Sequence, residues 1–208
     1  MYKLNKREFI LGSAAVASFA ASAGPAFAID LDELKKAPAL GEMAMGPEDA
    51  KVTVVEYASA TCPHCAAFYN ETFPAFKSEY IDTNKIRFLF REFPHNDAAL
   101  AAFMVARAAP KDAYFPLIDV FFKTQAAWVE NPREGLLNIA KQAGFTEESF
   151  NKAITDQAMA KSILEIRDKA STFGVTSIPT FFFVGSGEMI SGEQTIETMR
   201  SKIDPLLK

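Results

Sequence analysis

The segment Cys62-Pro63-His64-Cys65 holds the only two cysteines in this chain of 208 residues. It follows an apolar stretch typical of a strand and precedes an amphipathic stretch typical of a helix. The unpaired backbone N–H groups at a helix N-terminus favour negative charge, so a cysteine placed there becomes an unusually stable thiolate. Because the thiolate is the species that attacks disulfides, this motif predicts a redox-active dithiol.

Two strands and the helix between them should position the dithiol. Residues 52–57 form a β-rich run compatible with a buried strand, and residues 86–93 form a second strand. Pro74 lies inside the helix and is expected to kink it, because its ring clashes with the preceding turn and it lacks an N–H. The aromatic side chains that follow Cys65 share one helical face, namely Tyr69, Phe73, Phe76 and Tyr80.

The remainder of the chain predicts a helical block and then a hairpin. Residues 96–173 are helical by every local signal, beginning with Asn96-Asp97 as a cap and with later helices closed by Gly144 and Gly174. The face of the helix closed by Gly174 is marked by Met159, Ile163, Ile166, Ala170 and Phe173. Residues 181–184 and 188–191 predict two strands joined by a tight turn, and an amphipathic helix ends the chain. The expected order is therefore strand, helix, strand, helical block, hairpin, helix.

The N-terminal region should divide into a cleavable signal peptide and an extension. Three basic residues, Lys3, Lys6 and Arg7, precede a modestly apolar run, and small residues lead to a cleavage site near Ala28. The general secretory route is the default, although the basic pair also resembles a weakened twin-arginine signal. Residues 29–50 should then form a packed extension with one short helix followed by helix-breaking residues.

Composition limits the classes of partner. The formal net charge is −4, and removal of a signal peptide with a net charge of +2 leaves about −6, which argues against nucleic acid. No later stretch approaches the roughly 20 apolar residues of a transmembrane helix, so we expect no stable membrane insertion. Removing 28 residues from 208 leaves 180, enough for a substantial core without a disulfide scaffold.

Three elements occur in register along the chain: Glu56 six positions before the first cysteine, the Cys62–Cys65 motif, and Ser177-Ile178-Pro179-Thr180 before a Phe-rich strand. With these elements the chain resembles the DsbA-like branch of the thioredoxin superfamily. The resemblance implies an α/β protein with a thioredoxin fold and an inserted helical domain. The implied division is a signal peptide at 1–28, an extension at 29–50, a thioredoxin-like domain at 51–95 and 174–208, and an insertion at 96–173.

The two cysteines should have different roles in a redox-active disulfide. Cys62 is expected to be the exposed nucleophile at the helix boundary, and Cys65 the more buried resolving thiol one turn later. His64 is interpreted as a donor of a hydrogen bond or positive charge to the thiolate, with a solvent-facing position as the alternative. His95 lacks such a context and is expected to be a loop residue.

The other site residues follow from the resemblance. It makes Pro179 a cis-proline that faces the dithiol, which would leave the backbone of Ile178 free to pair with an extended substrate. Glu56 is interpreted as an acid beneath the disulfide that relays a proton for Cys65 and has a raised pKa, the alternative being an ordinary core acid. Arg91 could pair with Glu56 or with a surface acid.

The expected function is that of a periplasmic thiol:disulfide oxidoreductase, most simply a dithiol oxidase that introduces disulfides into reduced, unfolded exported proteins. It would need no cofactor and would be reoxidised by a membrane partner of the DsbB type. A disulfide isomerase or reductase is the first alternative, because the extension resembles those of relatives that oligomerise or act as isomerases. A metal-binding or chaperone protein is the second, although two cysteines and two histidines poorly supply the roughly four ligands of a closed zinc site.

Overall fold

The computed structural model describes residues 30–208, so the predicted signal peptide lies outside the described residues. The strands are β1 (Met43–Met45), β2 (Val52–Ala58), β3 (Ile86–Glu92), β4 (Thr180–Phe183) and β5 (Glu188–Ser191). The α-helices are α1 (Leu31–Lys35), α2 (Pro63–Ala67), α3 (Phe73–Phe76), α4 (Asp97–Ala108), α5 (Tyr114–Lys123), α6 (Gln125–Glu130), α7 (Pro132–Gln142), α8 (Glu147–Ile154), α9 (Gln157–Thr172) and α10 (Ile196–Leu207). Two π-helical segments, η1 (Phe68–Thr72) and η2 (Lys77–Ile81), and a 3-10 turn, η3 (Lys111–Ala113), complete the chain.

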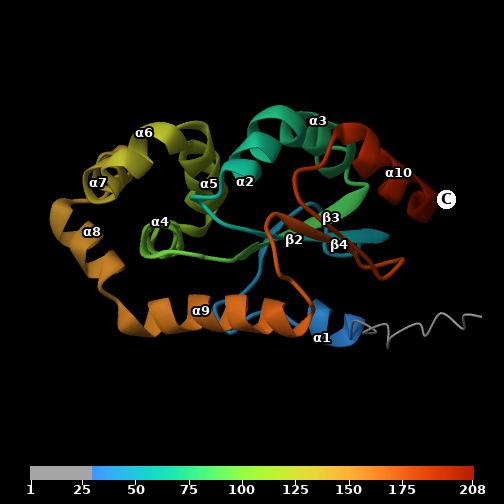
Figure 1. The fold of residues 1–208 in the computed structure, drawn as a ribbon, viewed down its shortest axis with the longest axis horizontal. Helices are drawn as coiled ribbons and strands as arrows, with labels where there is room; N and C mark the ends of the chain where they lie inside the picture. Colours follow the sequence, from blue (N-terminus) through green and yellow to red (C-terminus); the bar gives the residue numbers. More distant parts are fainter. Residues whose placement is uncertain (1–29) are drawn as a thin grey trace, which may run out of the picture.

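The five strands form one mixed sheet in the order β1-β3-β2-β4-β5. Strand β2 lies at its centre, parallel to β3 and antiparallel to β4. Helices α2, α3 and α10 cover one face of the sheet, α1 and α9 lie along the other, and α4 to α8 gather at one end (Figure 1). Because both faces of β2 are covered, nearly all of its residues are buried. The dithiol thus follows the most enclosed strand of the sheet.

The helical run that follows the dithiol changes its hydrogen bonding just before Pro74. The π-helical segment η1 ends at Thr72, and Pro74 occupies the first turn of α3. A proline inside a helix cannot donate a backbone hydrogen bond and crowds the preceding turn, and a locally widened turn relieves that crowding. The predicted apolar face is buried as expected, at Tyr69, Phe73, Phe76 and Tyr80.

Helices α4 to α9 form the predicted helical block. Asn96 caps α4, because its side-chain oxygen accepts a backbone hydrogen bond at 2.8 Å. Gly144 and Gly174 follow α7 and α9 with φ of +89° and +85°, a conformation that favours glycine at the end of a helix. Helix α9 is the longest and runs beneath the sheet (Figure 1). It buries the side chains predicted to line its inner face, including Ile163, Ile166 and Ala170.

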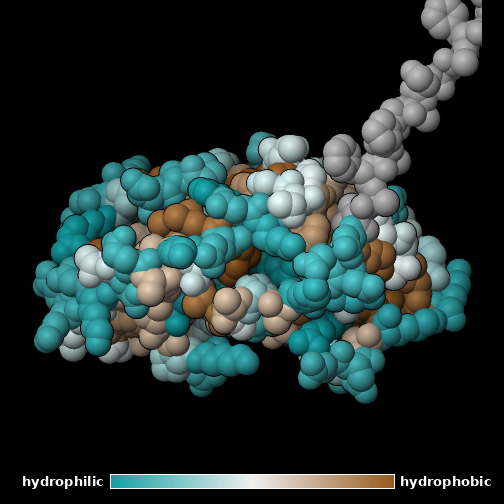
Figure 2. Space-filling model, turned by 90° about the horizontal axis from the view of Figure 1, so that it is seen from below, coloured by the Kyte–Doolittle hydropathy of each residue, from teal (hydrophilic) through white to brown (hydrophobic). Residues whose placement is uncertain are grey.

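The outer surface of α1 and α9 is mostly hydrophilic (Figure 2). The exposed residues of α9 include Lys161, Glu165 and Asp168, so the helix is amphipathic, with its apolar side on the sheet. Over residues 30–208, no helix is both long enough and apolar enough to cross a membrane.

The N-terminal extension contributes a strand that the sequence did not predict. Strand β1 pairs antiparallel with β3 at the edge of the sheet. It has three residues, too few for an alternating pattern to be visible, and Gly46 ends it with φ of +82°. A Cβ at Gly46 would lie 2.2 Å from the backbone oxygen of Ile86, so this close approach requires glycine. Leu34 of α1 is fully buried in a cluster that includes Ile166 of α9.

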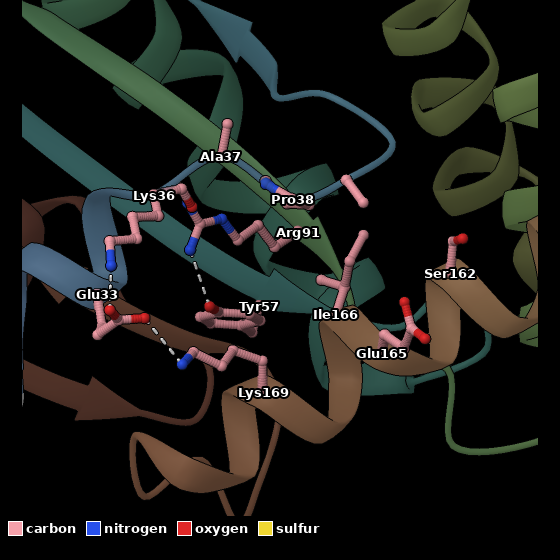
Figure 3. Close-up of a pocket in the computed structure, with 11 residues that line it drawn as sticks. Glu33, Lys36, Ala37, Pro38, Tyr57, Arg91, Ser162, Glu165, Ile166 and Lys169 are labelled. Carbon is pink, nitrogen blue, oxygen red and sulfur yellow. Dashed lines mark hydrogen bonds and ion pairs between the residues drawn. The ribbon is translucent and has the colours of Figure 1, made fainter.

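Arg91 pairs with neither Glu56 nor an exposed acid. Its guanidinium donates to the carboxylate of Glu42, with an Nη2–Oε2 distance of 2.7 Å, and to the hydroxyl of Tyr57 at 3.0 Å. The side chains of Arg91 and Glu42 are 3% and 10% exposed. The extension therefore supplies the buried partner of Arg91, which no local pattern in the sequence could identify. Figure 3 shows the second of these bonds, from Arg91 to the hydroxyl of Tyr57.

Candidate active site

Cys62 is the N-cap residue of α2, and Pro63 occupies the first helical turn. The amide of Cys62 donates to the carbonyl of Ser59 at 3.1 Å, which closes the turn between β2 and α2. Because Pro63 has no N–H, the amides of His64 and Cys65 are the first free donors of the helix, and both act on the Cys62 sulfur. The helix N-terminus is thus aimed at this thiol.

The surroundings of the two thiols shift their pKa values in opposite directions. A hydrogen bond from the Cys65 thiol, followed by the two backbone amides, lowers the pKa of Cys62 from 9 to about 6, although burial opposes this shift. Burial raises the pKa of Cys65 well above its ordinary value, and the neighbouring Cys62 adds to the effect. At neutral pH the structure therefore favours a single thiolate, on Cys62.

Cys62 is largely buried, so the prediction of an exposed nucleophile was wrong. Both cysteines are free thiols in this structure, with Cys62 7% exposed and Cys65 fully buried. The difference from the expectation arises because the loop before β4 covers Cys62, whose Sγ donates to the carbonyl of Ile178 at 3.6 Å. Cys62 remains the more accessible of the two sulfur atoms.

The loop before β4 lies beside the dithiol and contains a cis peptide bond between Ile178 and Pro179. The cis bond expected from the family resemblance is therefore present. The carbonyl of Pro179 accepts a hydrogen bond from the amide of Gly192 at 2.7 Å, which ties the loop to the end of the hairpin. Sheet and loop together place the Ile178 backbone beside Cys62.

Glu56 lies on β2 and is completely buried. Within residues 30–208, neither of its carboxyl oxygens has a hydrogen-bond partner, and the hydroxyl of Tyr69 has none. Burial raises the pKa of Glu56 well above its usual range, and the hydroxyl of Tyr69 opposes this shift only in part. The charge of the carboxylate adds in turn to the raised pKa of Cys65, after the larger effects of burial and of Cys62.

His64 points away from the dithiol. Its side chain is 72% exposed, and its Nδ1 lies 3.5 Å from a carboxyl oxygen of Glu193. Its influence on Cys62 in this structure comes from its backbone amide. The imidazole thus occupies the solvent-facing position that the sequence allowed as the alternative.

Two residues near the dithiol were not identified from the sequence. The side-chain amide of Gln125, on α6, donates to the carbonyls of Ala60 and Cys62 at 2.9 and 3.1 Å. His95, which follows β3, has its Nδ1 2.8 Å from the hydroxyl of Ser59. Both approach from distant parts of the chain, so no local spacing marks them.

The pocket drawn in Figure 3, about 240 Å³ in volume, lies between α1 and α9. Tyr57 and Glu56 are neighbours on β2 and therefore point to opposite faces of the sheet, so this pocket is on the other side from the acid near Cys65. Lys36 and Lys169 both pair with Glu33 at its edge. Glu33, Lys36 and Lys169 are thus engaged with one another, and the pocket is separate from the dithiol site.

Known proteins of similar sequence are named as protein-disulfide oxidoreductases. A protein-family model for thioredoxin matches residues 39–205. A relative from Rickettsia bellii, named as a protein-disulfide oxidoreductase, is 36% identical over 180 residues, which cover 78% of this chain and 68% of the relative. In four further Rickettsia relatives with that name, the match covers 56–61% of their length. The chain therefore spans about two thirds or less of the length of these curated relatives.

Solved structures show the same fold. A variant of Wolbachia pipientis alpha-DsbA1 has a TM-score of 0.77 and 28% identity, covering 85% of this chain and 95% of that chain. A protein-disulfide isomerase from Novosphingobium aromaticivorans has a TM-score of 0.71 and 20% identity, covering 83% and 100%, and shows the shared fold alone. The predicted α/β thioredoxin fold with a helical insertion is confirmed. The chain belongs to the DsbA-like branch of the thioredoxin superfamily.

Proposed function

We propose that this protein is a periplasmic dithiol oxidase that introduces disulfide bonds into reduced, unfolded exported proteins. The observation that carries the proposal is the opposite shift of the two thiols: the pKa of Cys62 is lowered to about 6, and the pKa of Cys65 is raised by burial. A stabilised thiolate stabilises the reduced dithiol relative to the disulfide, so the disulfide form more readily accepts electrons from other thiols.

The size of this effect follows from the pKa of Cys62. At pH 7 a thiol with a pKa of about 6 is roughly tenfold more thiolate than thiol, whereas a pKa of 9 gives roughly a hundredth. Ionisation therefore stabilises the reduced protein by about 1.4 kcal/mol, which raises the reduction potential by about 30 mV for a two-electron couple. The shift is in the direction that an oxidase needs.

The proposed cycle begins when a substrate thiolate attacks the Cys62 sulfur of the disulfide. The bond to Cys65 breaks, and the Cys65 sulfur takes up a proton, for which Glu56 is the proposed donor because burial favours its protonated form. A second substrate thiolate then attacks the substrate sulfur of the mixed disulfide, and Cys62 leaves as a thiolate. Two electrons pass to the protein, which ends as a dithiol, and the substrate gains a disulfide.

Ile178 and Pro179 are proposed to bind the substrate. The Ile178 carbonyl lies beside Cys62, where an extended peptide would pair with it as an added strand while its thiol approaches the sulfur. His64 is proposed to supply positive charge to the thiolate when its side chain turns from Glu193, a rotation that its exposure permits.

The cycle needs an acceptor for the two electrons that the dithiol gains. A membrane partner of the DsbB type is proposed for this step, as the family resemblance implies. Export to the periplasm is supported by the basic, apolar and small-residue pattern that ends near Ala28.

The test of this function is the oxidation of a reduced peptide with two cysteines, monitored through the loss of free thiols. We expect Cys62→Ser to abolish it, because the attacked sulfur is lost. When the reduced Cys65→Ser variant is mixed with a peptide disulfide, it should accumulate the mixed disulfide between Cys62 and the peptide, since the resolving thiol is missing. Ser186→Ala, on the exposed turn of the hairpin, is the matched control and should retain full activity.

Two outcomes would redirect the assignment. Full activity of Cys62→Ser would exclude the dithiol mechanism and leave a chaperone. If the wild-type protein rearranged or reduced peptide disulfides without forming them, it would be an isomerase or reductase of the same fold.

A further inference from the structure

His95 lies in the loop between β3 and α4, close to the turn that carries the dithiol. The loop is held there because the amide of Phe93 donates to the carbonyl of Ala58 at 2.8 Å. The Nδ1 atom of His95 lies 2.8 Å from the hydroxyl of Ser59, a completely buried residue three positions before Cys62. We propose that His95 is a positioning residue for the Cys62 thiolate, which holds the turn through Ser59 and adds positive charge beside it.

The hydrogen bonds of Asn96 fix the tautomer of the neutral ring. Its Oδ1 accepts the amide of Ala99 at 2.8 Å as the cap of α4, so its Nδ2 must be a donor. This Nδ2 lies 2.9 Å from the hydroxyl of Thr61 and 3.3 Å from Nε2 of His95. Nε2 is therefore the acceptor, and the ring proton resides on Nδ1 and is donated to Ser59.

Ser59 connects the ring to both thiols. Its carbonyl accepts the Cys62 amide at 3.1 Å, and its own amide acts on the Cys65 sulfur, where it lowers the pKa of that thiol. By fixing the Ser59 side chain, His95 holds the residue whose backbone acts on both cysteines. A second proton on the ring, at Nε2, replaces the bond from Asn96, and the positive charge that it creates adds to the effects of Cys65 and the two backbone amides in lowering the pKa of Cys62.

The charges around His95 leave it available for this role. Asp97 of α4 and Arg167 of α9 line a pocket of about 240 Å³ with it, and Arg167 pairs with Asp168 of its own helix. The motif histidine differs, because His64 faces the carboxylate of Glu193. Over residues 30–208, the hydrogen bonds of His95 go to a hydroxyl and an amide, so its charge is not taken up by a carboxylate.

The catalytic importance of this residue rests on the proposed function, but its effect on the thiolate can be measured separately. The ultraviolet absorbance of the thiolate, titrated against pH in the reduced protein, gives the midpoint for Cys62. We expect His95→Ala to raise this midpoint by about 0.5, equal to a roughly threefold change in the ionisation constant. The exchange equilibrium with glutathione should move about threefold toward the protein disulfide, because the reduced form loses stabilisation.

Two further variants separate this role from other effects of the substitution. His95→Gln retains a neutral donor for Ser59 and should give a midpoint between those of the wild type and the alanine variant. Arg167→Gln removes another cation of the same pocket and should leave the midpoint unchanged.

An unchanged midpoint in His95→Ala would overturn the inference, and so would an equal shift in Arg167→Gln, since the effect would then belong to the general charge of the pocket. A midpoint shift in a protein that proves to be a reductant would sustain the role of His95 and refute the oxidase assignment.

Discussion

At the residue scale, the burial of Glu56 is unfavourable for stability. Both carboxyl oxygens are enclosed without a hydrogen-bond partner in the described residues, and a buried polar group left unpaired costs about 1–3 kcal/mol. The carboxyl lies close enough to Cys65 to raise the pKa of that thiol. A cost of this kind at a reactive centre accords with the proposed proton relay, in which the acid must be both buried and near the leaving sulfur.

Glu56→Gln should therefore stabilise the protein and slow its chemistry. The pKa of Glu56 in the folded protein is raised above the ordinary value of 4.5, so the unfolded chain ionises first as pH rises. Above about pH 4.5 the wild type loses up to about 1.4 kcal/mol of stability per pH unit until the folded pKa is reached. Measured by urea unfolding, the free energy of unfolding of Glu56→Gln should exceed that of the wild type at pH 7, and this difference should vanish near pH 4.

In Glu56→Gln, Cys65 should resolve the mixed disulfide between Cys62 and a peptide several-fold more slowly at pH 7. Rapid mixing of the reduced protein with a peptide disulfide measures this rate. A stability gain that is equal at pH 4 and pH 7 would show that the carboxyl does not titrate as described. An unchanged rate would remove the proton relay.

The spacing of the two cysteines at a helix start predicted the dithiol, and the family resemblance implied the cis-proline loop and a role for Glu56. It did not reveal His95, which meets Ser59 across 36 positions of the chain, or the cover over Cys62 from Ile178, 116 positions away. Such contacts depend on how the loops fold back over the sheet edge, and no local period records them.

At the element scale, the helical block is tied to the dithiol turn by α6. Gln125 begins this helix, and its amide donates to the carbonyls of Ala60 and Cys62, which belong to the turn rather than to a strand or helix interior. The block therefore contributes to the position of the reactive sulfur in addition to enclosing the end of the sheet.

Gln125→Ala should loosen this turn. Loss of two hydrogen bonds to buried carbonyls is expected to lower the free energy of unfolding by about 1–3 kcal/mol, and the Cys62 thiol should react faster with a small alkylating reagent. Gln142→Ala, an exposed residue at the end of α7, is the control and should change neither quantity. Equal alkylation rates in Gln125→Ala and wild type would mean that the block does not hold the turn.

Helices and strands with a long sequence pattern were predicted correctly. The face of α9, the cap at Asn96 and the hairpin of β4 and β5 all occur where expected. The three residues of β1 were missed because pairing with β3 alone makes them a strand. The change of hydrogen bonding before Pro74 was expected as a kink, and its form as a π-helical segment depends on the packing of the aromatic face.

At the scale of the whole molecule, the N-terminal extension is built into the domain. It supplies an edge strand, the buried Leu34 and the acid that pairs with Arg91. Arg91 also donates to the carbonyl of Lys36 at 3.2 Å, so a single guanidinium joins the extension to β2 and β3. Within the described residues these contacts give the extension a structural role in the monomer.

Removing one partner of this buried pair should be costly. Glu42→Gln is expected to lower the free energy of unfolding by about 3–5 kcal/mol in urea, because the Arg91 charge remains buried without its carboxylate. Replacing both residues with Leu and Met should recover much of the loss. Glu48→Gln is the control, since the Glu48 side chain that pairs with Arg87 is 91% exposed and the pair should be worth less than about 1 kcal/mol. A small effect of Glu42→Gln would show that the extension is held mainly by its apolar contacts.

The equilibrium reduction potential of the Cys62–Cys65 pair against glutathione tests the central claim most directly. The oxidase assignment predicts a potential above that of the glutathione couple, and the lowered pKa of Cys62 contributes about 30 mV in that direction by stabilising the reduced dithiol. Such a value would make the protein a donor of disulfides. A potential well below the glutathione couple would contradict the oxidase assignment and make the protein a reductant with the same fold.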